Sequence, residues 1–258
     1  MTSKLPNLHC PSVLFLALTT VPMFPRSPLR VGVPVREHLT VSFSALRNDK
    51  TGYSWYRLAQ KMSADDFSPD SSDAVAWYDE NAEAIVERHE SIAPEKVNDW
   101  LEDVLPNQPS LVLDVGAGSG RDAAWLASRG HQVIAVEPSE QMRTRGMRLH
   151  GTDKIRWIND RLPGLENVHR LGISFDFILL NAVWMHVLPT NRRRAFRKLV
   201  TLLKPGAWIA ISFRQADPGN PRSMFPCHVD ELEQLARIHG TFVERVETAN
   251  DQLARTGI

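Results

Sequence analysis

The chain has 258 residues, of which 43% are hydrophobic and 23% are charged, as expected for a protein with a sizeable core. Lys and Arg together number 30, as do Asp and Glu, which argues against a broad basic surface for nucleic acid and against an acidic tail. The two cysteines, Cys10 and Cys227, show no metal-ligand spacing and fit a reduced setting better than a disulfide. We therefore expect a cytoplasmic protein without a resident metal.

Residues 1–72 differ from the rest and predict an N-terminal extension that is poorly ordered or only partly structured. Pro11–Phe24 is apolar but too short to span a bilayer, and no small-residue cleavage site follows it. A poorly ordered leader is favoured over a signal peptide, and no membrane span is predicted. Alternation of apolar and polar residues in His38–Leu46 suggests a short strand, and Tyr53–Met62 a short helix.

From residue 73 to residue 258, helical and strand patterns alternate and predict a second domain. Helical spacing of apolar residues predicts helices over Ala74–His89, Pro94–Val104, Arg121–Ser128, Pro138–Met147, Asn191–Leu203 and Val229–His239. Short apolar runs predict strands over Leu111–Val115, His131–Glu137, Ile155–Asn159, Phe175–Leu180, Ala207–Phe213 and Thr241–Val246. This order predicts an α/β fold in which helices flank both faces of a doubly wound, mostly parallel sheet in three layers.

A glycine loop follows the first predicted strand of this domain and ends in Gly116-Ala117-Gly118-Ser119-Gly120. Glycines let the backbone turn tightly near a ligand, and the helix that follows offers free N–H groups. The spacing is Gly-x-Gly-x-Gly, whereas dinucleotide-binding loops have Gly-x-Gly-x-x-Gly.

Two carboxylates accompany the loop. Asp114 would repel a pyrophosphate but could accept a hydrogen bond from an ammonium group. Glu137 ends the second strand, where it could accept both hydroxyls of a ribose. The combination favours a cofactor that joins an amino acid to a nucleoside.

These segments resemble the motifs of the class I S-adenosylmethionine (SAM)-dependent methyltransferases. Leu111–Gly120 is similar to their first motif and Val136-Glu137 to their second-strand acid, and Asp160 stands where the family commonly binds the adenine amino group. The remaining similar segments are Phe175–His186 with the fourth strand, Leu202–Trp208 with the turn before the fifth, and Trp77–Ala82 with a helix that closes over the cofactor. The resemblance extends from about Ala74 to Val246 and implies SAM as the cofactor.

The resemblance also implies a set of site residues. The implied cofactor-binding residues are Tyr78, Asp114, Gly116, Ala117, Gly118, Gly120, Arg121, Glu137, Pro138, Asp160, Arg161 and Asn181. His186 is the candidate general base, although a packed histidine would show the same pattern. Asp114 and Asp160 could instead stabilise turns, and Arg121 could be solvated. The basic run that contains Arg192, Arg193, Arg194, Arg197 and Lys198 is interpreted as a solvated helix face.

The predicted function is methyl transfer from SAM to an acceptor, and the neutral charge and the helix over the cofactor favour a small molecule. Two alternatives remain: a non-catalytic methyltransferase-like binding module and an NAD(P)-binding Rossmann oxidoreductase. The first follows from the sheet, since the family's sheet ends in a two-stranded hairpin and only Thr241–Val246 is clear here. Either the chain is truncated or His38–Leu46 fills the vacant place. The sequence predicts no oligomeric state.

Overall fold

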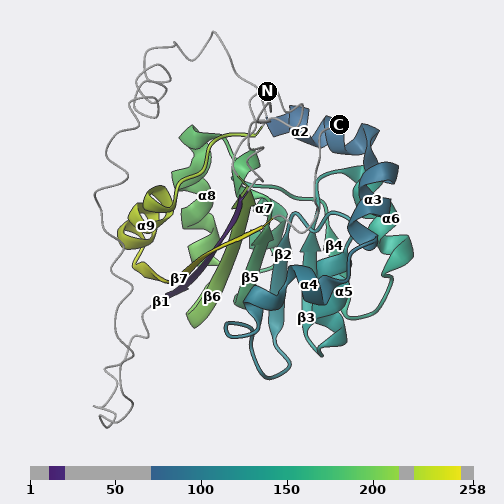
Figure 1. Cartoon of the computed structure of the whole chain (residues 1–258). Coiled ribbons are helices and arrows are strands. Elements are labelled where there is room, and N and C mark those ends of the chain that lie inside the picture. The colour runs from purple at the N-terminus through teal and green to yellow at the C-terminus, as the bar shows by residue number, and fades with distance from the viewer. Residues whose placement is uncertain (1–11, 21–70, 215–223, 251–258) are drawn as a thin grey trace, which may run out of the picture. The chain divides into compact units, whose positions relative to one another are not determined.

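The computed structural model describes residues 12–20, 71–214 and 224–250 (Figure 1). The chain divides into two compact units, one formed by Met1–Met23 with Asp70–Ile258 and the other by Phe24–Pro69. All described elements belong to the first unit. The predicted segments His38–Leu46 and Tyr53–Met62 lie outside the described residues.

The described strands form one seven-stranded sheet in the order β4-β3-β2-β5-β6-β1-β7. Its strands are β1 (Ser12–Thr20), β2 (Leu111–Val115), β3 (Gln132–Val136), β4 (Ile155–Ile158), β5 (Phe175–Asn181), β6 (Leu203–Arg214) and β7 (Thr241–Asn250). Strands β2 to β6 are mutually parallel, and the strand order reverses direction between β2 and β5. The predicted doubly wound α/β fold is confirmed, and the switch point marks where a ligand is expected.

The place of the last strand, for which the C-terminal end of the chain offered no candidate, is filled by β1 from the N-terminal region. An N-terminal segment was one of the two explanations predicted for this place, but β1 is Ser12–Thr20 and not His38–Leu46. β1 pairs antiparallel with β6 on one side and with β7 on the other, so that Leu16 lies opposite both Ile211 and Val246. The apolar run that suggested a poorly ordered leader is a strand in the interior of the sheet, where such runs are common. Its partners lie far along the chain, and a local pattern cannot indicate them.

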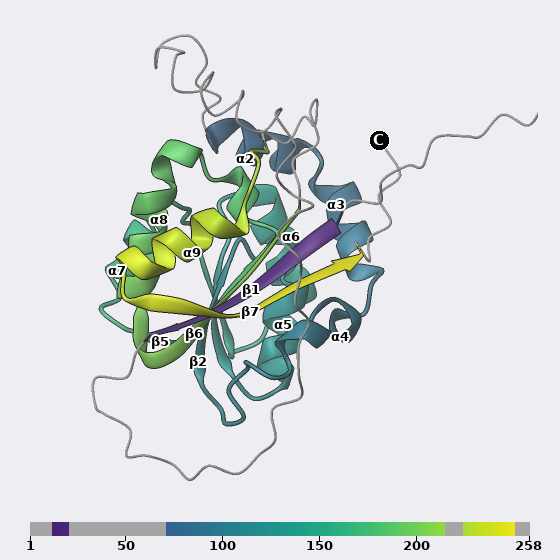
Figure 2. The ribbon, with the colours of Figure 1, turned by 60° about the vertical axis from the view of Figure 1, so that its left-hand side comes forward.

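Helices occupy both faces of the sheet. They are α2 (Ser71–Glu80), α3 (Ala82–Glu90), α4 (Pro94–Val97), α5 (Arg121–Ser128), α6 (Glu140–Leu149), α7 (Glu166–His169), α8 (Pro189–Thr201) and α9 (Val229–Ile238), with 3-10 turns η1 (Asp99–Leu101) and η2 (Trp184–His186). Figure 2 shows α7, α8 and α9 on one side of the sheet and α3 to α6 on the other. The three predicted layers are therefore present.

Several element boundaries differ from the predictions, and three of the differences bear on the shape of the molecule. The helix expected over Ala74–His89 is divided between α2 and α3 at Asn81, whose side-chain amide donates to the Trp77 carbonyl. The helix expected over Pro94–Val104 is only the short α4 followed by η1. Strand β6 begins at Leu203, before the Lys-Pro-Gly turn that was expected to precede it.

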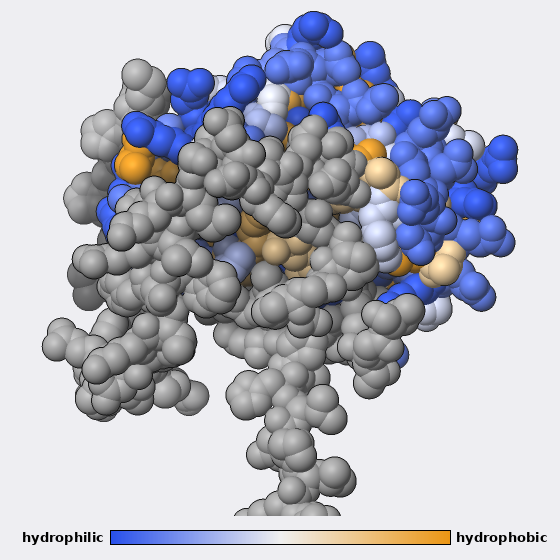
Figure 3. Space-filling view, turned by 90° about the horizontal axis from the view of Figure 1, so that it is seen from above, coloured by the Kyte–Doolittle hydropathy of each residue, from blue (hydrophilic) through white to orange (hydrophobic). Residues whose placement is uncertain are grey.

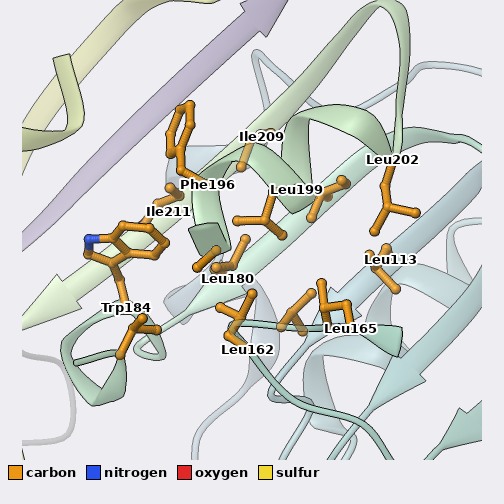
Figure 4. Packing of buried hydrophobic residues seen from close by; sticks show 14 of the residues in the cluster. Leu113, Leu162, Leu165, Leu180, Trp184, Phe196, Leu199, Leu202, Ile209 and Ile211 are labelled. Atoms are coloured by element: carbon orange, nitrogen blue, oxygen red, sulfur yellow. The ribbon is translucent and has the colours of Figure 1, made fainter. Parts of the chain in front are cut away.

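Apolar side chains fill the space on both faces of the sheet. On one face the cluster includes Trp184, Phe196 and Leu199, which Figure 4 shows packed together with leucines from the strands and loops. On the other face Trp100, Trp125 and neighbouring aliphatic residues cover β2, β3 and β5. Burial of each large side chain contributes about 1.5–3 kcal/mol to folding. This packing holds the carboxyl ends of the parallel strands in a fixed arrangement.

No helix among the described residues has the length and apolar character needed to cross a membrane.

Candidate functional site

The glycine loop lies between the end of β2 and the start of α5, and its shape requires glycine. Gly116, Gly118 and Gly120 have φ angles of 73°, 57° and 86°, a region that side chains disfavour. A Cβ atom at Gly116 would collide with the Val183 side chain, and one at Gly120 would lie 2.7 Å from Trp157. The backbone of the loop therefore passes directly beneath the segment that follows β5.

Glu137 lies at the end of β3 and joins the glycine loop to the start of α6. Its Oε2 atom accepts a hydrogen bond from the Gly118 backbone N–H (2.8 Å), and Oε1 accepts one from the Ser139 N–H (2.9 Å). The side chain is buried, and burial raises its pKa to about 7 although both N–H groups and Arg143 act in the opposite direction. Each oxygen retains a lone pair that a ligand hydroxyl could use.

Asp114 is buried at the end of β2, behind the glycine loop. Its Oδ2 atom has no hydrogen-bond partner in the described part of the chain. Burial, followed by the nearby Asp122 and Glu137 carboxylates, raises the pKa of Asp114 well above its usual range. A positive charge brought next to the loop would favour the ionised form of this carboxyl.

A third buried carboxylate, Asp122, begins a series of hydrogen bonds that leads from α5 to the ends of β5 and β6. It accepts from the Arg121 Nε (2.9 Å), from Asn98 (2.9 Å) and from the Asn181 amide (2.8 Å). Burial alone would raise its pKa, but the Arg121 charge and these bonds hold that pKa below its usual value. The Asn181 Oδ1 in turn accepts from the Ser212 hydroxyl (2.5 Å). The amide of Asn181 is thus held in one orientation.

The segment after β5 turns sharply toward the glycine loop. Ala182 has a φ angle of 58°, and its N–H donates to the Ser212 hydroxyl (2.9 Å). The turn places Val183 against the loop and leads into η2, where the His186 Nε2 lies 3.4 Å from the Tyr78 hydroxyl. Tyr78 comes from α2, so that two elements distant in sequence meet here.

Asp160 follows β4 and organises its own loop. Its carboxylate accepts hydrogen bonds from the backbone N–H groups of Arg161 (2.9 Å) and Val168 (3.0 Å). Asp160 therefore stabilises a turn, as the alternative interpretation predicted, and it also lines the neighbouring cavity.

A cavity of about 150 Å³ lies between these groups. The predicted site residues that line it are Tyr78, Gly116, Gly118, Glu137, Pro138, Asp160, Arg161, Asn181 and His186. Among the described residues, Asp114, Ala117, Gly120 and Arg121 are not part of this lining. In Figure 3, hydrophobic residues are visible at the centre of the face that carries α2, beside hydrophilic ones. The structure thus brings most of the predicted site together.

Among the lining residues that were not predicted, three carry a basic side chain: Arg88, His89 and Arg214. Burial, and next the Arg121 charge, lowers the pKa of His89 to about 4, so its imidazole is neutral at neutral pH. Its backbone carbonyl accepts from the Arg121 guanidinium (3.2 Å). His89 ends a predicted helix, and no spacing in the sequence indicates that it lines the cavity. Arg214 is the last residue of β6, and its position alone does not indicate a role in a site.

Arg192 is buried, which corrects its interpretation as part of a solvated helix face. Arg121 is buried as well, which argues against the solvated alternative for that residue. Arg192 donates to the Val187 and Pro226 carbonyls (3.1 and 2.8 Å) and to Glu231 (2.6 Å). Through these bonds Arg192 connects Val187, the residue after His186, to the segment before α9. Its guanidinium thus bonds to groups of the protein interior.

Comparison with known proteins gives matches to methyltransferases. The profile of the family described as "Methyltransferase domain" matches residues 113–211. An uncharacterized methyltransferase of Alkaliphilus oremlandii is 29% identical over 134 residues, which are 50% of this chain and 55% of that protein. One of Mycobacterium tuberculosis (strain H37Rv) is 30% identical over 132 residues, 51% of this chain and 49% of that protein. The chain spans about half the length of the curated relatives it matches.

Solved structures also match. One is the 1,6-didemethyltoxoflavin-N1-methyltransferase of Burkholderia thailandensis with bound 1,6-didemethyltoxoflavin and S-adenosylhomocysteine, at 23% identity and a TM-score of 0.48. The match covers 67% of this chain and 81% of that chain.

Proposed function

We propose that the chain is a class I SAM-dependent methyltransferase that transfers a methyl group from SAM to a small-molecule acceptor; the match of residues 113–211 to the family described as "Methyltransferase domain" and the likeness to uncharacterized methyltransferases support this. The observation that carries the proposal is the position of Glu137. Its buried carboxylate lies at the end of β3, is bonded to Gly118 of the glycine loop, and lines the cavity. A ribose diol is the ligand group that such a carboxylate fits, because each oxygen can accept one further hydrogen bond.

The residues present fit the rest of the cofactor as well. The unpartnered Oδ2 of Asp114 and the two other carboxylates around the loop suit a ligand that carries positive charge. The loop has no side chain at Gly116 or Gly118, and its backbone borders the cavity. In this proposal Glu137 holds the ribose, Asp160 and Arg161 face the adenine, and the glycine loop faces the amino-acid part.

SAM, when bound, supplies a methyl group already activated by its positively charged sulfur. The protein's remaining tasks are to align the acceptor and to exclude water. Tyr78 from α2 and Val183 from the turn after β5 border the cavity and serve the second task. For an acceptor that must lose a proton, the His186 Nε2 is the base in this proposal, since it lies in the cavity beside the Tyr78 hydroxyl.

The lining of the cavity supports a small acceptor. The cavity is bordered by Ala74, Val75 and Tyr78 of α2, which favours a compact acceptor over a flat macromolecular surface. The non-catalytic alternative lost its main support when β1 was found in the place expected to be vacant.

Calorimetric titration with SAM and, separately, with NAD tests the cofactor. We expect a saturable signal with SAM and none with NAD at the same concentrations. Incubation with methyl-radiolabelled SAM and fractionated small-molecule extracts then tests the transfer, and label in a low-molecular-weight product is the expected result. A folded protein that binds NAD but not SAM would refute the proposal. Label found only in protein or nucleic acid would refute the small-molecule acceptor.

A further inference from the structure

The last turn of α2 is attached to the start of α6 by one carboxylate, Asp79. Its Oδ1 atom accepts hydrogen bonds from the Ser139 hydroxyl (2.6 Å) and from the Gln141 backbone N–H (2.9 Å). Ser139 is the N-cap of α6, and its hydroxyl oxygen accepts from the Met142 N–H (3.1 Å). Asp79 therefore supplies a second acceptor and a negative charge at the end of α6 where backbone N–H groups are exposed, an arrangement that stabilises the contact.

Ser139 connects this contact to the cavity. Its backbone N–H donates to Glu137 Oε1, while the other oxygen of Glu137 accepts from Gly118. An unbroken series of hydrogen bonds thus runs from Asp79 on α2, through Ser139 and Glu137, to the glycine loop. The residue that precedes Asp79, Tyr78, lines the cavity and contacts His186. A shift of α2 along α6 would therefore displace Tyr78 as well.

We infer that Asp79 is a positioning residue of the cofactor site: it docks α2 onto the N-terminus of α6 and, through Ser139, fixes the Glu137 carboxylate that faces the cofactor ribose. The inference rests on the proposed function, because it takes SAM as the occupant of the cavity. Asp79 does not line the cavity, so it acts through Ser139 and Tyr78 and not by touching the cofactor.

The pH dependence of ligand affinity distinguishes this positioning role from a contact that only holds α2 against α6. The charged groups that act on Glu137 are Asp79 from α2, Asp114 from β2 and Arg143 from α6, and Asp160 and Arg161 border the same cavity after β4. Burial is the main cause of the raised pKa of Glu137, and the negative charge of Asp79 adds to it. If that charge alone is removed, we expect the pKa of Glu137 to fall. Glu137 then stays ionised, and binds the ribose tightly, at lower pH than in the wild type.

The test is calorimetric binding of S-adenosylhomocysteine and of 5′-methylthioadenosine, which keeps the ribose and adenine but lacks the amino-acid part. We expect Asp79→Ala to weaken binding of both probes by about 5- to 10-fold. Glu83→Ala is the matched control, since Glu83 is a largely exposed acid on α3 that forms an ion pair with Arg145 of α6 (3.5 Å). It should change both dissociation constants by less than about twofold.

The second variant, Asp79→Asn, keeps an oxygen that can accept from Ser139 and Gln141 but removes the charge. For the wild-type protein, affinity for S-adenosylhomocysteine should rise as pH increases through about 7, the pKa of Glu137, and level off above it, where Glu137 is ionised. In Asp79→Asn the levelling-off should occur at lower pH, and circular dichroism should confirm that the variant is folded.

The possible outcomes separate the two proposals. An unchanged pH profile in Asp79→Asn would overturn the inference, as would equal effects of Asp79→Ala and Glu83→Ala. A loss confined to S-adenosylhomocysteine and absent for 5′-methylthioadenosine would also overturn it, because the effect would then lie away from the ribose. If the folded wild-type protein binds neither probe, the proposed function itself fails. If Asp79→Ala does not fold, the pH profile of Asp79→Asn still decides.

Discussion

Replacement of Glu137 by glutamine tests the cofactor site most directly, because the two side chains have nearly the same shape. Glu137 uses both oxygens to accept backbone N–H groups, from Gly118 at 2.8 Å and from Ser139 at 2.9 Å. A glutamine has only one oxygen. Whichever way its amide turns, its NH₂ group must face one of these two N–H donors. The substitution therefore places the glutamine NH₂ group against a buried backbone N–H donor, and it also removes the negative charge.

The structure sets the size of the effect. Leaving one buried donor unsatisfied costs about 1–3 kcal/mol of unfolding free energy, and a hydrogen bond from a ribose hydroxyl to a charged acceptor contributes about 1.5–3 kcal/mol. We therefore expect Glu137→Gln to lower the free energy of unfolding by about 1–3 kcal/mol. We expect its dissociation constant for S-adenosylhomocysteine at pH 8 to rise by about 10- to 100-fold.

The assay is calorimetric binding at pH 8 and pH 6, combined with urea unfolding. Because the pKa of Glu137 is about 7, the carboxyl is largely protonated at pH 6 and the difference in affinity between the wild type and the variant should narrow there. Glu140→Gln is the control, since Glu140 is an exposed acid in the first turn of α6, three residues after Glu137. A Glu137→Gln dissociation constant within about threefold of the wild type at pH 8 would refute the role of Glu137 in ribose binding.

Three further predictions concern the surrounding structure. Gly116→Ala combines a φ angle of 73° with a collision against Val183, so thermal unfolding should show a loss of about 2–5 kcal/mol, and a stable variant would refute the close approach. Arg192→Ala should cost about 3–5 kcal/mol in urea unfolding and exposed Arg193→Ala less than about 0.5 kcal/mol; similar losses would argue against the buried ion pair. His89 has a folded pKa of about 4 against 6.5, so the stability that its neutral form provides is lost as pH falls from 6.5 toward 4. Relative to the wild type, His89→Gln should remove a slope of up to about 1.4 kcal/mol per pH unit in that window, and an identical slope in both proteins would contradict this.

The parts of the site that could be predicted from the sequence are those that depend only on the order and direction of the strands. Strands β2 to β5 are apolar runs, and the carboxyl ends of parallel strands meet at one edge of a sheet. The residues after those runs, among them Gly116, Glu137, Asp160 and Asn181, therefore had to lie near one another. The structure brings all four to one cavity. Their chemistry then follows from residue type and spacing, without knowledge of side-chain packing.

Contacts between separate elements could not be predicted in the same way. Asp79 occupies an ordinary position on an amphipathic helix, and nothing in the sequence shows that it meets Ser139. For Arg192 a usable signal was present. It lies three, four and seven residues before Ala195, Phe196 and Leu199, which are all buried, so it belongs to the inward stripe of α8. The dense arginine run obscured that spacing.

The place of β1 shows how one long-range pairing can change a functional interpretation. With only β7 visible, the sheet seemed to expose an edge of β6, and such an edge would favour association or loss of activity. β1 removes that argument by pairing with β6 from Val13 to Thr19. The pairing also brings the N-terminal segment beside the strand that ends in Arg214, a residue of the cavity. Residues outside the segment that matches the methyltransferase family therefore complete the sheet that carries Arg214 of the cavity.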